Sequence, residues 1–111
     1  MVGHSIQVWQ VDLSDAKGRE QKQKRPALLW RDLDHVGLAI VIPITSNLER
    51  EKMAHTHRIS ADAKNGLEEE SVILVFQIRA IDKNRLVKKL GELGEDDTKA
   101  VVGLLKDLLR L

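Results

Sequence analysis

The feature that most constrains this chain is a short, unbroken apolar run, Leu38-Ala-Ile-Val-Ile-Pro-Ile44. It is rich in β-branched residues and lies between Gly37 and the polar residues Thr45-Ser46-Asn47. Seven residues are far fewer than the roughly 20 that a membrane-spanning helix needs. A run of this kind is typical of a strand buried on both faces. Pro43 predicts a bulge or a sheet edge near its end, because proline donates no ladder hydrogen bond.

Other short segments also read as strands. Ile6 to Leu13 has two partly apolar faces, and Pro26 fits the first residue of a strand that continues through Trp30. Further strands are expected at 57–60 and 71–79, on either side of the turn dipeptide Asn65-Gly66, and at 87–93. Five or six strands this short cannot bury two faces in an open sheet. We therefore expect a mainly β (α+β) fold, a small closed barrel that forms one domain over residues 1–111.

One amphipathic helix is expected at the end of the chain, over residues 95–110. Its apolar residues recur at helical spacing, and Glu95, Asp96 and Asp97 occupy the end at which the helix dipole favours acids. Residues 82–86 predict a single helical turn, and residues 48–56 a mobile polar connection.

Composition excludes several kinds of chemistry. The 111 residues include no cysteine, so disulfide scaffolds, thiol catalysis and cysteine zinc sites are ruled out. His55 and His57 would share one strand face as solvated side chains, and Glu68-Glu69-Glu70 reads as a solvated loop. With neither an export segment nor a membrane span in the sequence, we expect a cytoplasmic protein.

A basic loop stands out against the net charge of +1. Residues 16–31 carry six Lys and Arg against a single acid, Glu20, and Arg25 lies directly before Pro26. An arginine offers a planar fork of donors suited to phosphate, and a hydroxyl at a strand end, such as that of Thr45, is held in a fixed position. Phosphate chemistry by this pair is one interpretation. In the alternative, Arg25 is a surface charge and Thr45 caps its strand.

At these positions the sequence resembles the MazF/PemK family of toxins, the ribonuclease halves of bacterial toxin–antitoxin pairs. The resembling segments are Val8-Trp-Gln-Val-Asp-Leu13, Gly18-Arg-Glu-Gln21, Lys24-Arg-Pro26, Pro43-Ile-Thr-Ser46 and Gln77-Ile-Arg-Ala-Ile-Asp-Lys-Asn-Arg-Leu86. They occur in the family's order and are followed by a leucine-rich helix. Together they are far more specific than any one of them.

The resemblance implies an SH3-like barrel with a terminal helix, usually a homodimer. It implies metal-independent cleavage of single-stranded RNA at short sequence motifs, without a cofactor, and inhibition by a cognate MazE-like antitoxin. Arg25 and Thr45 carry over as the catalytic pair. The 2′-hydroxyl of RNA would attack the phosphorus and leave a 2′,3′-cyclic phosphate and a 5′-hydroxyl.

Seven further residues are expected to bind the substrate. They are Arg19, Glu20, Gln21, Lys22, Lys24, Ser46 and Gln77. Glu20 is also a candidate general base, or else a carboxylate that fixes Arg25. Some PemK-like members have His and Asp where this chain has Arg19 and Phe76, and neither residue here can exchange a proton near neutral pH. That departure favours the mechanism based on Arg25 and Thr45.

Two other functions remain open at this point. CcdB-like toxins share the barrel but act by protein contact with DNA gyrase, without catalysis. A degenerate toxin that only binds its antitoxin is the third reading, suggested by Phe76. The Arg25-Pro26 and Pro43-Ile-Thr-Ser46 motifs favour the nuclease, because a protein-contact toxin does not need that pair.

Overall fold

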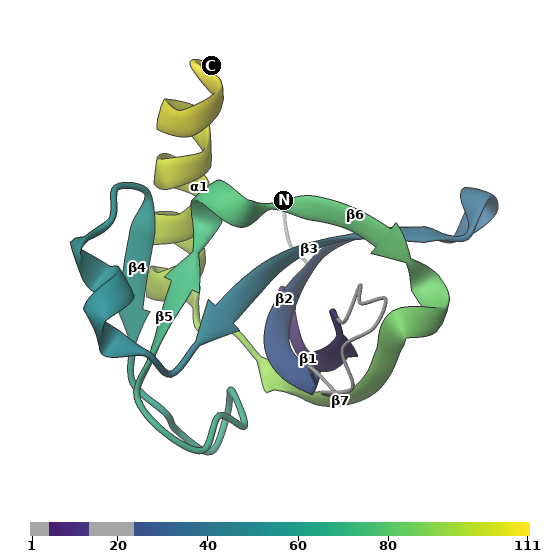
Figure 1. The fold of residues 1–111 in the computed structure, drawn as a ribbon, viewed down its shortest axis with the longest axis horizontal. Coiled ribbons are helices and arrows are strands. Elements are labelled where there is room, and N and C mark those ends of the chain that lie inside the picture. The colour runs from purple at the N-terminus through teal and green to yellow at the C-terminus, as the bar shows by residue number, and fades with distance from the viewer. Residues whose placement is uncertain (1–4, 14–23) are drawn as a thin grey trace, which may run out of the picture.

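A computed structural model describes residues 5–13 and 24–111 of the chain, and within them it contains seven strands and one α-helix (Figure 1). The strands are β1 (Gln7–Asp12), β2 (Lys24–Leu33), β3 (Leu38–Thr45), β4 (Thr56–Ile59), β5 (Ser71–Leu74), β6 (Arg79–Asp82) and β7 (Leu86–Glu92), and the helix is α1 (Glu95–Leu109). Four short 3-10 helices connect them: η1 (Asp34–Val36), η2 (Leu48–Lys52), η3 (Val75–Gln77) and η4 (Lys83–Arg85).

Strand β3, the apolar run of the sequence, is the hub of the sheet. One of its edges pairs with β2 over most of its length. The other edge pairs with β6 over Leu38–Val41 and with β5 at Ile44 and Thr45. Pro43 lies between these two partners, where a residue without an N–H is tolerated.

The curled sheet returns on itself. Its order runs β4-β5-β3-β2-β1-β7, with β6 paired to β3, and η4 joins β6 directly to β7. Figure 1 shows β1, β2, β3, β6 and β7 arranged around a ring, with β4, β5 and α1 to one side. The barrel-like fold with a terminal helix is therefore confirmed, although η4 closes the ring through the chain and not through strand pairing.

The expected count of five or six strands was too low. Residues 71–79 were predicted as one strand, but the 3-10 helix η3 divides them into β5 and β6. Both parts pair with the same edge of β3, and η3 shifts the register between them by three residues. Periodicity over so short an apolar segment does not reveal such an insertion.

Two separate apolar cores explain the two-faced character of β1. Val8 packs into the larger core, between the barrel and α1, together with Leu28, Ile42 and Leu105. Val11 packs into a smaller core inside the barrel, whose other fully or nearly buried members are Ala27, Ala39, Val41 and Ile81. The same strand thus supplies both cores from opposite faces.

Helix α1 is tied to β4 by two histidines, a correction to the expectation of solvated side chains on one strand face. His55 lies just before β4 with a positive φ of 60°, and its Nε2 is 2.8 Å from the Asp107 carboxylate. His57 Nε2 is 2.8 Å from Asp97. Both ring nitrogens face acids of α1, so the histidines help to dock the helix.

The connections outside the barrel are also ordered. Residues 48–52, expected to be part of a mobile segment, form η2, with Asn47 as its N-cap. Lys83 of η4 donates to Asp32 and Asp34, at 3.2 and 2.7 Å, and its ammonium lowers the pKa of the Asp34 carboxyl. Within the described ranges, no helix is long and apolar enough to cross a membrane.

Candidate active site

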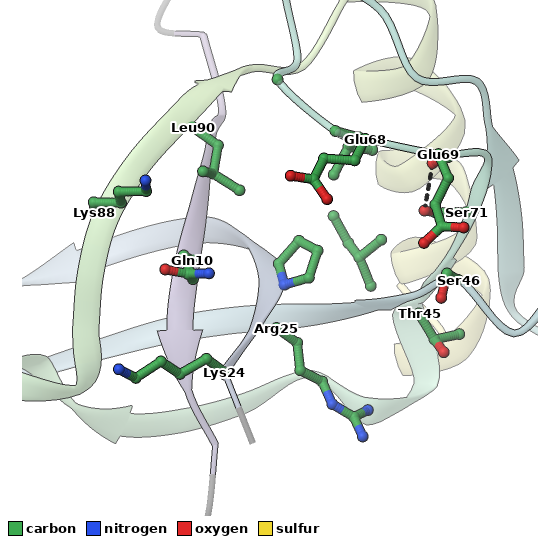
Figure 2. Close-up of a pocket in the computed structure, with 14 residues that line it drawn as sticks. Gln10, Lys24, Arg25, Thr45, Ser46, Glu68, Glu69, Ser71, Lys88 and Leu90 are labelled. Carbon is green, nitrogen blue, oxygen red and sulfur yellow. Dashed lines mark hydrogen bonds between the residues drawn. The ribbon is translucent and has the colours of Figure 1, made fainter. Parts of the chain in front are cut away.

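A polar cavity of about 420 Å³ opens where the start of β2 meets the end of β3 (Figure 2). Strands β1 and β7 and the β4–β5 connection complete its walls. Its lining residues are Gln10, Lys24, Arg25, Pro26, Ile44, Thr45, Ser46, Gly66, Leu67, Glu68, Glu69, Ser71, Lys88 and Leu90. Cations, hydroxyls and carboxylates thus share one space of a size that holds a small ligand.

Arg25 reaches this cavity from the second residue of β2. It pairs with Val11 of β1, so its backbone belongs to the sheet while its side chain is exposed. Pro26 pairs with Gln10 and is the third residue of the strand, not the first as expected. Two residues of the basic loop, Lys24 and Arg25, are therefore fixed in position by the sheet.

Thr45 is the last residue of β3, where it pairs with Val72 of β5. Its Oγ1 accepts a hydrogen bond of 3.1 Å from the Asn47 backbone N–H, and Asn47 Oδ1 accepts one from Glu49 N–H. Because a hydroxyl accepts and donates independently, the Thr45 O–H proton remains able to point at a ligand. Ser46 lies beside it, as Figure 2 shows.

The β4–β5 connection forms a wall of the cavity that the sequence did not indicate. Glu68 and Glu69 line it, which corrects the interpretation of that segment as merely a solvated loop. In Figure 2 the Glu68 carboxylate points toward the middle of the cavity, and Glu69 lies near Ser71 and Ser46. The Asn65-Gly66 turn was the one available signal that this segment has a defined shape.

Gln10 and Lys88 are two further lining residues that sequence reasoning missed. Register brings them together, because Gln10 of β1 pairs with Pro26 on one side and with Lys88 on the other. Lys88 therefore lies two strands away from the start of β2, in a different part of the sequence. Only strand pairing could have placed it at the site.

One of the remaining predicted residues, Gln77, falls elsewhere. Gln77 is exposed at the end of η3 and is not among the residues that line the cavity. Arg19, Glu20, Gln21 and Lys22 lie outside the described residues. Among the described residues, no three His, Cys, Asp or Glu side chains form a group that could hold a metal ion.

The fold and the cavity together define a small barrel protein whose polar pocket combines Arg25 with the Thr45 hydroxyl. Residues 4–109 match the family model described as "PemK-like, MazF-like toxin of type II toxin-antitoxin system". The chain belongs to this family of toxins.

Two curated relatives support the assignment at the level of sequence. The chain is 40% identical over 95 residues to the endoribonuclease EndoA of Bacillus subtilis, covering 80% of this chain and 78% of that protein. It is 36% identical over 97 residues to the endoribonuclease MazF of Staphylococcus saprophyticus, covering 85% and 80%.

Solved structures show the same fold. MazF from Deinococcus radiodurans (Form-I) superposes with a TM-score of 0.74 at 24% identity, over 100% of this chain and 99% of that one. The MazE–MazF structure (Form-II) from the same organism gives a TM-score of 0.73 at 26% identity, over 100% and 98%.

Proposed function

We propose that this protein is an endoribonuclease toxin that cleaves single-stranded RNA at short sequence motifs and is neutralised by a cognate MazE-like antitoxin. Two relatives of the chain are named endoribonucleases, which supports the cleavage of RNA. A structural neighbour is a MazE–MazF complex, which supports neutralisation by an antitoxin. The observation that carries the proposal is the convergence of Arg25 and Thr45, 20 positions apart in the sequence, on one cavity.

RNA cleavage suits this pair because the substrate supplies its own nucleophile. The ribose 2′-hydroxyl attacks the adjacent phosphorus in line, and the bond to the 5′-oxygen breaks. The products are a 2′,3′-cyclic phosphate and a 5′-hydroxyl. The protein needs only to hold the chain in that geometry and to stabilise the charge that grows on the phosphoryl oxygens.

Arg25 and Thr45 have separate roles in this reaction. The Arg25 guanidinium pairs with the phosphoryl oxygens through two parallel N–H groups and orients the leaving 5′-oxygen by a hydrogen bond. The Thr45 hydroxyl donates to a phosphoryl oxygen while Asn47 N–H fixes its orientation. No step in this scheme uses a metal ion or another cofactor.

The cations around Arg25 and Thr45 favour a substrate that carries several phosphates. Lys24 and Lys88 line the same cavity as Arg25, so they are placed to meet neighbouring phosphates of a nucleic acid. The same positive charge suits an antitoxin whose acidic, extended tail orders on the basic loop. We further propose that the toxin acts as a homodimer in the cytoplasm, where RNA is its target.

The test compares Arg25→Ala with Arg31→Ala, an exposed arginine of the same strand that does not line the cavity. Arg25→Ala should abolish cleavage of a mixed single-stranded RNA, whereas Arg31→Ala should cleave at close to the wild-type rate. EDTA should leave the wild-type rate unchanged, and the mapped product ends should carry a 2′,3′-cyclic phosphate.

The outcomes separate the proposal from its alternatives. Full inhibition by EDTA would contradict the metal-independent mechanism. Growth arrest by an Arg25→Ala, Thr45→Ala double variant would favour a toxin that acts by protein contact, as CcdB-like toxins do on DNA gyrase. A wild-type protein that neither cleaves RNA nor arrests growth would point to a degenerate toxin.

A further inference from the structure

We propose that Glu68 reads a nucleobase that carries an exocyclic amino group, next to the phosphate held by Arg25 and Thr45. This inference rests on the proposed function, because it assigns part of the sequence specificity of the same cavity. Glu68 is exposed, lines the cavity, and in Figure 2 its carboxylate points toward the middle of it.

The backbone on both sides of Glu68 is anchored, which gives the carboxylate a defined position. Leu67 is buried in the larger core, and its N–H donates to Asn65 Oδ1 at 2.9 Å. On the other side, the Ser71 hydroxyl donates to the Glu69 carbonyl at 2.8 Å. A short segment held at both ends can present one side chain to a ligand with little loss of conformational entropy.

Asn65 is the reason that this connection is rigid. Its side chain is buried, accepts a second hydrogen bond from Asp62 N–H and donates to the Ser60 carbonyl at 2.9 Å. Gly66 then packs directly on the Leu90 carbonyl of β7. The wall that carries Glu68 is thus fixed to the barrel.

Charge argues that Glu68 faces a base and not the backbone of the RNA. A carboxylate repels phosphates, and the cavity already offers Arg25, Lys24 and Lys88 to them. Figure 2 shows Lys24 and Lys88 coming from β2 and β7, whereas Glu68 comes from the β4–β5 connection. The cavity therefore has walls of opposite charge for the two parts of a nucleotide.

Hydrogen-bond chemistry narrows the class of base. An ionised carboxylate only accepts hydrogen bonds. Adenine, cytosine and guanine present amino groups on their Watson–Crick edges, the edges that proteins read in single-stranded RNA. Uracil presents one N–H between two carbonyl oxygens, and a carboxylate is repelled by both of these oxygens. Glu68 should therefore favour amino-bearing bases over uracil at one position beside the cut.

The test uses Glu68→Gln, because glutamine can also donate to the carbonyl oxygens of uracil. After the wild-type cleavage sites are mapped, each base beside the cut is changed in turn between cytosine and uracil. Wild type should prefer cytosine by about tenfold at one position, the order of one hydrogen bond to a charged group. Glu68→Gln should reduce that preference to about twofold or less and leave the other positions unchanged.

Glu70→Gln is the matched control. Glu70 belongs to the same acidic run but accepts from Arg58 Nε at 2.9 Å and does not line the cavity. It should keep the wild-type preference. Binding of RNA that lacks the attacked 2′-hydroxyl measures the preference again without the chemical step.

Each result bears on the inference. An unchanged preference in Glu68→Gln would overturn it and leave the nuclease assignment standing. A folded Glu68→Gln that binds RNA with wild-type preference but no longer cleaves would assign Glu68 to the chemistry and also overturn it. A wild-type protein that cleaves no RNA would overturn the proposed function and this inference together.

Discussion

Thr45 shows how a single residue serves both the fold and the site. Its backbone ends β3 by pairing with Val72, and its Oγ1 accepts from Asn47 N–H, which leads the chain into η2. The O–H proton is not used by that contact, so the hydroxyl can donate to a phosphoryl oxygen. The strand-cap interpretation and the catalytic interpretation of Thr45 are therefore compatible.

This dual role predicts different effects for two substitutions of Thr45. Thr45→Val keeps the shape but removes the hydroxyl, and it should lower the rate constant of RNA cleavage by about a hundred- to a thousandfold, the usual loss for one such donor. Thr45→Ser keeps the hydroxyl and should stay within about tenfold of wild type. Single-turnover kinetics measure both.

Thermal unfolding of the two Thr45 variants serves as the control, since both should melt close to the wild type. Equal rate constants for Thr45→Val and Thr45→Ser would show that the hydroxyl takes no part in cleavage.

At the scale of elements, the β4–β5 connection is held in a defined conformation by hydrogen bonds within it and to β7. Asn65 N–H donates to Asp62 Oδ1 at 2.7 Å, and Glu92 N–H of β7 donates to the Lys64 carbonyl at 2.9 Å. Gly66 has a φ of +70°, and a Cβ there would clash with the Leu90 carbonyl oxygen. Glycine is required here both by the backbone conformation and by the close approach of β7.

A comparison of two glycines tests this close packing. Gly37 has the same φ of +70°, but nothing lies within 4 Å of a Cβ built on it. Gly37→Ala should lower the free energy of unfolding by about 1 kcal/mol, the cost of the left-handed conformation. Gly66→Ala adds a backbone clash and should cost about 2–4 kcal/mol.

Urea denaturation of the two alanine variants gives these free energies. Similar losses of unfolding free energy at Gly37 and Gly66 would contradict the close packing of Gly66 on the Leu90 carbonyl of β7.

For the whole molecule, the larger core joins the barrel to α1. Val101 and Leu105 of α1 pack with Leu28 and Ile42 of the barrel. His57 of β4 and His55, just before that strand, contact acids of the helix. Most of the stability that the helix contributes should come from its apolar face, because a single helix of 15 residues is marginal in water.

Two leucines of the helix test this dependence. Leu105 is 8% exposed and Leu109 is 53% exposed. Leu105→Ala should lower the free energy of unfolding by about 3 kcal/mol, as is usual for a large-to-small change in a core. Leu109→Ala should change it by less than about 0.5 kcal/mol.

Denaturant unfolding should also remain a single transition in Leu105→Ala, since the smaller core shares strands with the larger one. Loss of the helix signal before the barrel unfolds would contradict that coupling.

The sequence by itself determined the elements whose signals are local. The buried run of β3, the amphipathic helix and the single turn at η4 follow from periodicity and capping, which depend only on neighbouring residues. Arg25 and Thr45 were selected as a pair from their residue types and from the motifs around them. Their catalytic roles stay a prediction, although both line one cavity.

Only the tertiary structure decided what depends on pairing and register. The division of residues 71–79 into β5 and β6 arises from a register shift against β3, which no local pattern encodes. Lys88 joins Gln10 at the cavity because β7 pairs with β1, and Glu68 joins them because the connection before β5 packs on β7. Contacts between distant segments are set by strand pairing in the curled sheet, so the chemistry of such residues can be read from the sequence but their proximity cannot.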